Sequence, residues 1–348
     1  MIARQVSRLL NASNLNFTLI IMALLLLKNG VHPIGQDWIS WIYSAGRSFP
    51  QPENYLSYSL FPVLMAKTLA YPGFILWWVL FLLLTAVFYL IVFTGINKAA
   101  KSEYKKWVMI FLSFPFMITP LYYLGHYDLL TIGGAVVAGL QNRKIFVFVG
   151  AFLAISANPE QAVFTSACVA ALAFGSRLPW HKYVAKVWLT LSITAFILLR
   201  IFLGSAEDGN RAKIIFGQLR DVVLNSAGLL HLIVFSVFSA GWLILGLIYN
   251  SNSGPIRNKF VLLGVVVIPV LLSLSILDRT RIGVAVGALP LILLFKQLMD
   301  SNSLEKILKL NIRQNHLFYA LLLTPTVIID TDGSLRLPYL ELINKFIV

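Results

Sequence analysis

The stretch of sequence that decides the fold is GFILWWVLFLLLTAVFYLIVFTG, residues 73–95. It contains no charged residue, and its length matches the ~20 apolar residues that an α-helix needs to cross the hydrocarbon core of a bilayer. The rest of the 348-residue chain has a similar character, since 58% of all residues are hydrophobic and 12% are charged. A soluble domain is about half apolar and a quarter charged. The composition therefore excludes a soluble globular enzyme, a disordered chain and a disulfide-stapled secreted module, and it predicts an all-α integral membrane protein.

Further apolar runs, separated by short polar breaks, predict a polytopic bundle of about eleven transmembrane helices in one membrane domain, residues 1–348. The predicted spans are 15–31, 73–95, 107–123, 128–141, 145–158, 161–176, 185–202, 229–249, 259–277, 282–298 and 315–330. Two of the shorter runs could instead form a re-entrant pair. Small residues in the fourth span are expected where helices pack closely: Gly133, Gly134, Ala138 and Gly139.

The distribution of Lys and Arg predicts the orientation. The chain carries 28 Lys and Arg against 14 Asp and Glu, a formal net charge of +14. Short loops rich in Lys and Arg stay in the cytoplasm, and with a cytoplasmic N-terminus the whole positive excess falls on the inner segments. We therefore expect a multi-pass protein of the inner (plasma) membrane, with its C-terminus and any active site extracytoplasmic. The charge reports topology, so nucleic acid is not expected as a partner, whereas membrane lipids are.

Residues 29–72 form the first extracytoplasmic loop of this topology and are not plainly polar. The segment 37–46 places Trp38 and Trp41 among apolar residues at helical spacing, and 55–69 is a second apolar piece of helical length. Aromatic residues at such positions suit the headgroup level of a membrane. After the first span we expect two juxtamembrane helices on the outer surface rather than two more spans.

Four outer turns place an acid at the mouth of a predicted span, around Asp37, Asp128, Glu160 and Asp278. Ionisable groups near hydrocarbon are costly and therefore point to function. Asp37 could be a general base for an acceptor hydroxyl, or it could be the N-cap of the helix that follows. Asp128 and Glu160 could equally serve only to stabilise helix N-termini through the helix dipole.

The last of these turns, Asp278-Arg279-Thr280-Arg281, sets two guanidinium groups beside an acid. Arg binds phosphate in a bidentate manner and stays charged in a low dielectric, so Arg279 and Arg281 suit a lipid phosphate. An Asp–Arg pair could also simply keep the turn in water.

The second extracytoplasmic loop, 203–228, contains Arg211 and Lys213 beside an amphipathic run. These cations could recognise an anionic lipid headgroup, or they could snorkel along the membrane surface.

No cofactor is expected from the remaining residues. The five histidines have no metal-ligand spacing, Cys168 is the only cysteine, and no Gly-rich phosphate loop is present. His126 lies next to Asp128 in sequence and could assist proton transfer or bind phosphate; it could also be an ordinary interfacial histidine.

This outline resembles the GT-C superfamily of integral-membrane glycosyltransferases, which use polyprenyl-phosphate sugars. The likeness rests on Asp37 in Gly35-Gln36-Asp37-Trp38, on the segments 37–46 and 55–69, and on the aromatic, Pro-containing stretch YLSYSLFP at 55–62. Many members carry two acids separated by one residue, whereas Asp37 stands alone. The mannosyl- and arabinosyl-type members with a single acid are therefore the closer analogy, and dependence on a divalent metal has no support.

The resemblance implies a lipid-linked sugar donor that enters from the outer leaflet, a glycolipid or lipid-linked saccharide as acceptor, and inverting transfer with Asp37 as general base. It implies that Arg279 or Arg281 stabilises the departing lipid phosphate. Further candidates for binding the substrate or its phosphate are Asp278, His126, Asp128, Glu160, Arg211 and Lys213. A transporter or flippase for a lipid-linked sugar is the alternative, and it would commonly show internal repeats and ionisable residues near the bilayer midplane. A non-catalytic subunit of a polysaccharide-export system is a third interpretation.

Overall fold

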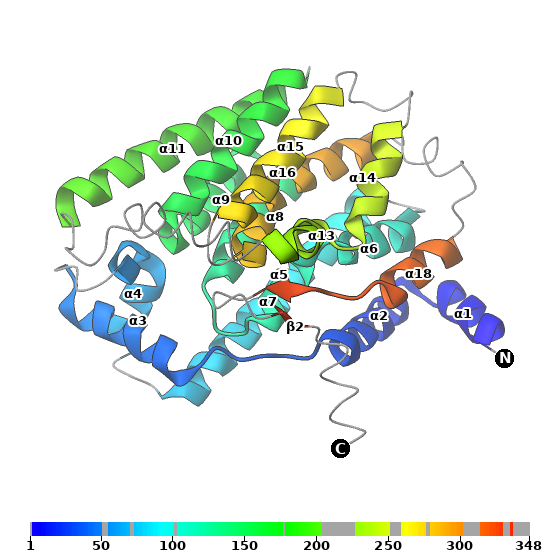
Figure 1. Cartoon of the computed structure of the whole chain (residues 1–348), viewed down its shortest axis with the longest axis horizontal. Coiled ribbons are helices and arrows are strands. Elements are labelled where there is room, and N and C mark those ends of the chain that lie inside the picture. The colour runs from blue at the N-terminus through cyan, green and yellow to red at the C-terminus, as the bar shows by residue number, and fades with distance from the viewer. Residues whose placement is uncertain are drawn as a thin grey trace.

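A computed structural model of the chain is mostly helical (Figure 1). It describes residues 2–50, 55–69, 73–100, 103–176, 178–203, 227–250, 259–275, 279–301, 314–329 and 335–336. Its α-helices are α1 Ile2–Asn11, α2 Asn14–Asn29, α3 Gln36–Ser48, α4 Leu60–Thr68, α5 Phe74–Ala100, α6 Tyr104–Leu112, α7 Thr119–Tyr122, α8 Asp128–Leu140, α9 Lys144–Ala157, α10 Pro159–Gly175, α11 Pro179–Leu203, α13 Leu230–Phe238, α14 Gly241–Asn250, α15 Lys259–Ser275, α16 Arg279–Asp300 and α18 Gln314–Leu323. Three 3₁₀ turns, η1 Tyr55–Tyr58, η3 Pro115–Met117 and η5 Ala227–Leu229, and an antiparallel pair of short strands, β1 Ile328–Ile329 and β2 Leu335–Arg336, complete the described part.

Among the described residues, three helices are long and apolar enough to cross a membrane: α5, α11 and α16. The pair α13 and α14 would make a fourth if its two halves, bent by 80°, formed one span. Helices α2, α8, α9 and α15 are apolar but shorter. The helical, membrane-compatible character expected from the sequence is thus present, and the arrangement in eleven spans remains a prediction.

The continuous helix expected over 107–123 is not formed. Helix α6 ends at Leu112, η3 begins at Pro115, and the short α7 carries Pro120 near its start. Proline has no N–H to donate and restricts the residue before it to extended backbone. Phe114 accordingly adopts φ −100° and ψ 137°.

The runs 229–249 and 315–330 are also interrupted. Helix α13 stops at Phe238 because Ser239 adopts φ 48°, and α14 leaves in a new direction. Helix α18 ends at Leu323, and the chain then becomes extended and forms β1. Hydropathy alone therefore overestimates the length of these helices.

Both helices expected in 29–72 are present as α3 and as η1 with α4. They pack against each other, and a Cβ at Gly46 of α3 would lie 2.9 Å from the carbonyl oxygen of Val63 in α4. The apolar face of α3 buries Ile39 and Ile42, while Trp41 is exposed. A position of these helices at the membrane surface remains a prediction.

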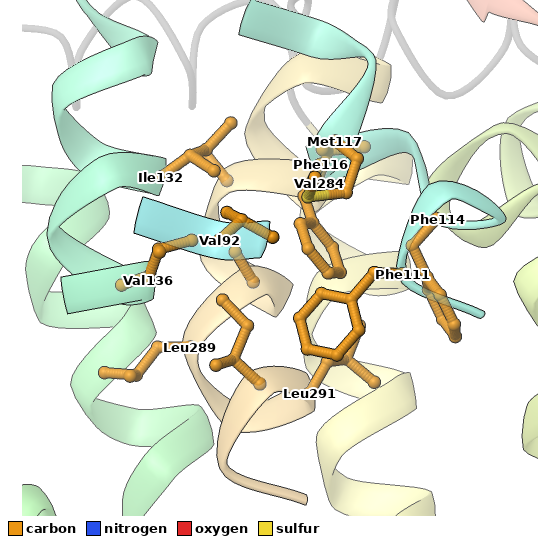
Figure 2. Packing of buried hydrophobic residues seen from close by; sticks show 14 of the residues in the cluster. Val92, Phe111, Phe114, Phe116, Met117, Ile132, Val136, Val284, Leu289 and Leu291 are labelled. Carbon is orange, nitrogen blue, oxygen red and sulfur yellow. The ribbon is translucent and has the colours of Figure 1, made fainter. Parts of the chain in front are cut away.

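Helix α16 lies at the centre of the bundle. In the most apolar 18-residue stretch of α16, 89% of the residues are buried, against 28% in the corresponding stretches of α5 and of α11. Figure 2 shows side chains of α5, α6, α8, α16 and the segment around η3 packed together. Large apolar side chains on the outer faces of α5 and α11 are exposed, as expected where lipid replaces water: Ile75, Leu83, Leu90, Ile201 and Phe202.

Close helix packing occurs at the small residues of α8. A Cβ at Gly134 would lie 2.3 Å from the carbonyl oxygen of Gly150 in α9, and a Cβ at Gly139 would lie 2.4 Å from Ile292 in α16. Glycine is needed at both positions because any side chain would separate the helices. Gly133, in contrast, has only an ordinary contact at 4.0 Å.

Candidate functional site

Three helices, α8, α10 and α16, begin at one end of the bundle and bring polar side chains together there. Asp128 is the first residue of α8, Gln161 lies in the first turn of α10, and Arg281 lies in the first turn of α16. Helix N-termini carry partial positive charge, so a buried carboxylate is favoured where they meet. The acid predicted at the mouth of the fourth span occupies this position.

Asp128 and Arg281 form a buried ion pair. The Nε atom of Arg281 lies 2.9 Å from Oδ2 of Asp128, whose side chain is 1% exposed, whereas that of Arg281 is 15% exposed. The Gln161 side chain lies close enough to the carboxylate to favour its charged form, and the guanidinium carbon lies 5.8 Å from the centre of the Tyr123 ring. We call Asp128, Arg281, His126 and Gln161 the buried polar cluster.

His126 has two competing partners in this cluster. Its Nδ1 lies 3.1 Å from the backbone nitrogen of Asp128 and 3.2 Å from Oδ2 of the same residue. One ring nitrogen cannot accept a hydrogen bond and donate one at the same time. Neutral at Nδ1, the ring accepts the bond from the backbone N–H of Asp128; protonated there, it donates to the carboxylate. The cluster therefore has two hydrogen-bonding states, which differ in whether Nδ1 carries a proton; a change of tautomer in the neutral ring is enough to exchange them.

The turn before α8 holds the histidine in place. Gly125 adopts φ 98°, a left-handed conformation that favours glycine. Its carbonyl oxygen accepts a 3.0 Å hydrogen bond from Nε1 of Trp77, and a Cβ on it would lie 3.0 Å from Ile34. The turn therefore packs between α5 and the segment that leads into α3.

The Asp37 region reaches the cluster through its neighbour Trp38. The Trp38 ring stacks on the His126 ring at a centroid distance of 5.5 Å, and the backbone N–H of Ile34 donates a 2.9 Å hydrogen bond to the carbonyl oxygen of Leu124. Asp37 itself is exposed. The start of α3 is thus fixed beside the cluster, with one exposed carboxylate on it.

Asp37 is not the N-cap of its helix. Gly35 occupies that position, without a side-chain cap, and Asp37 lies in the first turn of α3. A carboxylate there still interacts favourably with the helix dipole, but Asp37 does not occupy the capping position.

Glu160 lies in the first turn of α10 and forms a separate pair. Its Oε1 is 3.6 Å from Nη2 of Arg200 in α11, and both side chains are partly exposed. The guanidinium of Arg200 also lies over the Tyr58 ring at 4.9 Å, which connects α11 to η1. Asn158 caps α10, since its Oδ1 accepts the backbone N–H of Gln161 at 3.1 Å.

The remaining sequence-predicted residues, Asp278, Arg211 and Lys213, lie outside the described residues, as does the side chain of Arg279. Of the predicted set, the structure joins His126, Asp128 and Arg281 in one cluster, keeps Glu160 in a pair of its own, and leaves Asp37 exposed on α3. Among the described residues no group of three or more His, Cys, Asp and Glu side chains could hold a metal ion.

Trp38, Gln161 and Tyr123 also belong to this site, although the sequence did not indicate a functional role for them. The pattern Asn158-Pro159-Glu160-Gln161 is a helix start with a capping residue, and it could have drawn attention to Gln161. Trp38 and Tyr123 carry no such signal, because an aromatic ring beside a charged group looks the same in sequence as one in a core. No protein-family model, curated protein sequence or solved structure matches this chain.

Proposed function

We propose that the chain is a membrane glycosyltransferase that moves a sugar from a polyprenyl-phosphate donor to a lipid-linked glycan or glycolipid acceptor, with inversion. The reaction takes place at the extracytoplasmic face of the plasma membrane, with Asp37 as general base. One observation carries the proposal: the exposed carboxylate of Asp37 stands one residue before Trp38, whose ring packs on His126 of the buried polar cluster. An accessible base and a fixed guanidinium therefore occur at one end of a lipid-facing bundle.

The chemistry needs a base and a stabiliser for the leaving group. The carboxylate of Asp37 takes the proton of the acceptor hydroxyl as its oxygen attacks the anomeric carbon. The bond from that carbon to the phosphate oxygen breaks, and the lipid phosphate leaves with the electron pair. A preorganised positive charge lowers the energy of such a departing anion. Arg281 fits this role because its ion pair with Asp128 fixes the orientation of the guanidinium.

The lipid-facing helices support a lipid-linked donor. Helices α5 and α11 expose apolar side chains along their length, so a polyprenyl chain can lie against them in the bilayer. Holding the carrier lipid and the acceptor at one end of the bundle supplies the positioning that the transfer needs.

A transporter or flippase for a lipid-linked sugar is the second candidate. The observation in its favour is the buried polar cluster, in which Nδ1 of His126 can either accept the backbone N–H of Asp128 or donate to its carboxylate. Buried ionisable groups in membrane bundles commonly line transport or proton pathways. Against it, the sequence shows no internal repeat of the kind common in transporters.

The test uses purified protein in nanodiscs and a panel of polyprenyl-phosphate sugars, with donor consumption and glycosylated product as the measured quantities. We expect Asp37→Asn to lower the transfer rate about 10²- to 10⁴-fold, the usual contribution of a general base, with donor binding and thermal stability unchanged. Gln36→Asn is the matched control, because Gln36 is the exposed neighbour on α3.

The outcomes separate the candidates. Transfer by Asp37→Asn at the wild-type rate would refute the assignment of the base. Absence of donor consumption by the wild-type protein across the panel would refute the transferase. Movement of a lipid-linked sugar between leaflets without its consumption would establish the flippase instead.

A further inference from the structure

A cavity of about 360 Å³ lies between the C-terminal ends of α5, α8 and α16 and the start of α9. This volume falls within the range of small-molecule pockets. The polar side chains that line it are Lys98, Gln141, Asn142, Arg143, Lys296 and Asp300.

The cavity is remote from the buried polar cluster. Arg281 and Lys296 stand near opposite ends of α16, a separation of ~23 Å at a rise of ~1.5 Å per residue. Helix α5 likewise has Trp77 at the cluster end and Lys98 at the cavity end. Because α5 and α16 are candidate membrane spans, the two sites belong to opposite ends of these spans. The cavity holds cations from the segments predicted to be cytoplasmic.

The lining is positively charged. Lys296 is 8% exposed and forms an ion pair with Asp300, so these two charges compensate each other. Lys98 and Arg143 have no acidic partner among the described residues, and both are exposed residues that line the cavity. Two of the residues that line the space therefore carry a positive charge without a counter-charge from the described residues.

Helix dipoles do not account for the position of Arg143. A cation near a helix C-terminus is favourable, which suits Lys98 at the end of α5. Arg143, however, is the N-cap of α9, where positive charge is unfavourable; no side chain caps this helix start, and its first turn contains no acid. An uncapped helix N-terminus with a guanidinium beside it is a favourable place for an anion.

Snorkelling does not account for the lining either. Cations that only seek water would diverge from the bundle, whereas Lys98, Arg143 and Lys296 come from three separate segments and border one hollow. The side-chain amides of Gln141 and Asn142 line the same space and add hydrogen-bond donors.

We infer that this cavity binds a phosphate-bearing anion, held by the side chains of Lys98 and Arg143 and by backbone N–H groups in the first turn of α9. The anion is either the headgroup of an acidic phospholipid or a soluble phosphate compound; both present the same oxygens to the same donors. This site does not depend on the transferase proposal, since it involves none of the residues at the other end of the bundle.

The experiment measures binding of both sources to the full-length protein. Pyrophosphate is titrated into protein in phosphatidylcholine nanodiscs at constant ionic strength, with thermal stability as the readout. In a second arm, retention of phosphatidylglycerol by the protein is measured by native mass spectrometry. The test variant is Lys98→Gln with Arg143→Gln. The matched control is Lys144→Gln, which removes a neighbouring exposed cation that lies over the Tyr183 ring rather than at the cavity.

We expect saturable binding in one of the two arms, weakened at least tenfold in the double variant and unchanged in Lys144→Gln. The arm that saturates identifies the source of the phosphate. Equally weakened anion binding in Lys144→Gln would overturn the inference, because it would mean that the anion is attracted by the general positive charge of the surface. Failure of both probes to bind would overturn it as well. Asp37→Asn should bind the anion as tightly as the wild type does. The binding result can therefore be interpreted even if the transferase proposal is refuted.

Discussion

The buried carboxylate of Asp128 should depend strongly on Arg281 as its counter-charge, and Arg281→Met tests this. The substitution keeps an unbranched apolar stem and removes the guanidinium. Coulomb's law with an effective dielectric constant of ~20 gives about 6 kcal/mol for two unit charges separated by the 2.9 Å of this pair. Part of that attraction is offset by the cost of desolvating both groups.

Removal of one partner is expected to cost about 3–5 kcal/mol, the usual range when a buried charge loses its counter-charge. Asp128 has almost no access to water, so its carboxylate depends on the guanidinium, on Gln161 and on His126. The loss should be smaller for Asp128→Asn, because the partly exposed Arg281 can turn towards water.

The assay is the free energy of unfolding of the purified protein in bicelles, followed by tryptophan fluorescence during denaturant titration. Arg281→Met, Asp128→Asn and the double variant form a cycle that isolates the coupling between the two charges. The double variant should be more stable than Arg281→Met, because it leaves no unpaired carboxylate. Arg200→Met is the control: its pair with Glu160 is longer and partly exposed and should contribute about 0–1 kcal/mol.

Two results would refute this reasoning. One is an Arg281→Met variant within about 0.5 kcal/mol of the wild type, which is the scatter expected for surface substitutions. The other is strict additivity in the cycle, which would mean that the two charges do not interact.

Three further predictions concern packing and backbone. Gly134→Val should destabilise the protein by about 1–3 kcal/mol or more, because its Cβ would overlap the backbone of Gly150; thermal unfolding of the purified variant measures this. Ser239→Val should lower the stability of the protein by about 1–3 kcal/mol in the same assay, because a β-branched residue is strained at φ 48°. The stability of Ser239→Gly should lie within about 1 kcal/mol of that of the wild type. Trp38→Ala should lower transfer without lowering donor binding, since it removes the ring stacked on His126, and Trp38→Phe should restore most of the rate; full activity in Trp38→Ala would show that the stack does not position Asp37.

Local features of the chain were predictable because they depend on neighbours in sequence. The helical periodicity of 37–46 reappears as α3, and the small residues Gly134 and Gly139 do sit where helices touch. Continuous spans were overestimated where a single residue changes the backbone direction. Pro115 ends one predicted span, and Ser239 bends another. Hydropathy averages over a window and does not register such residues.

The candidate site was predictable only in part. The sequence indicates that Asp128 and Arg281 each lie near a helix start, since an acid or a basic turn borders an apolar run. It carries no sign that they form a pair, nor that Trp38 packs on His126. Side-chain pairing between distant segments depends on which helices are neighbours and on their rotation about their axes, and no local pattern encodes either.

By itself, then, the sequence determined that this chain is helical and suited to lipid, because apolar composition and run length act locally and additively. The tertiary structure decided which charges meet. The packing of α8, α10 and α16 brings three helix starts together around one carboxylate, and the packing of α3 leaves the acid beside Trp38 exposed at the same end. The physical reason is that burial makes an unpaired charge costly, so helix arrangements that bury Asp128 without Arg281 are disfavoured, and that condition couples segments far apart in the chain.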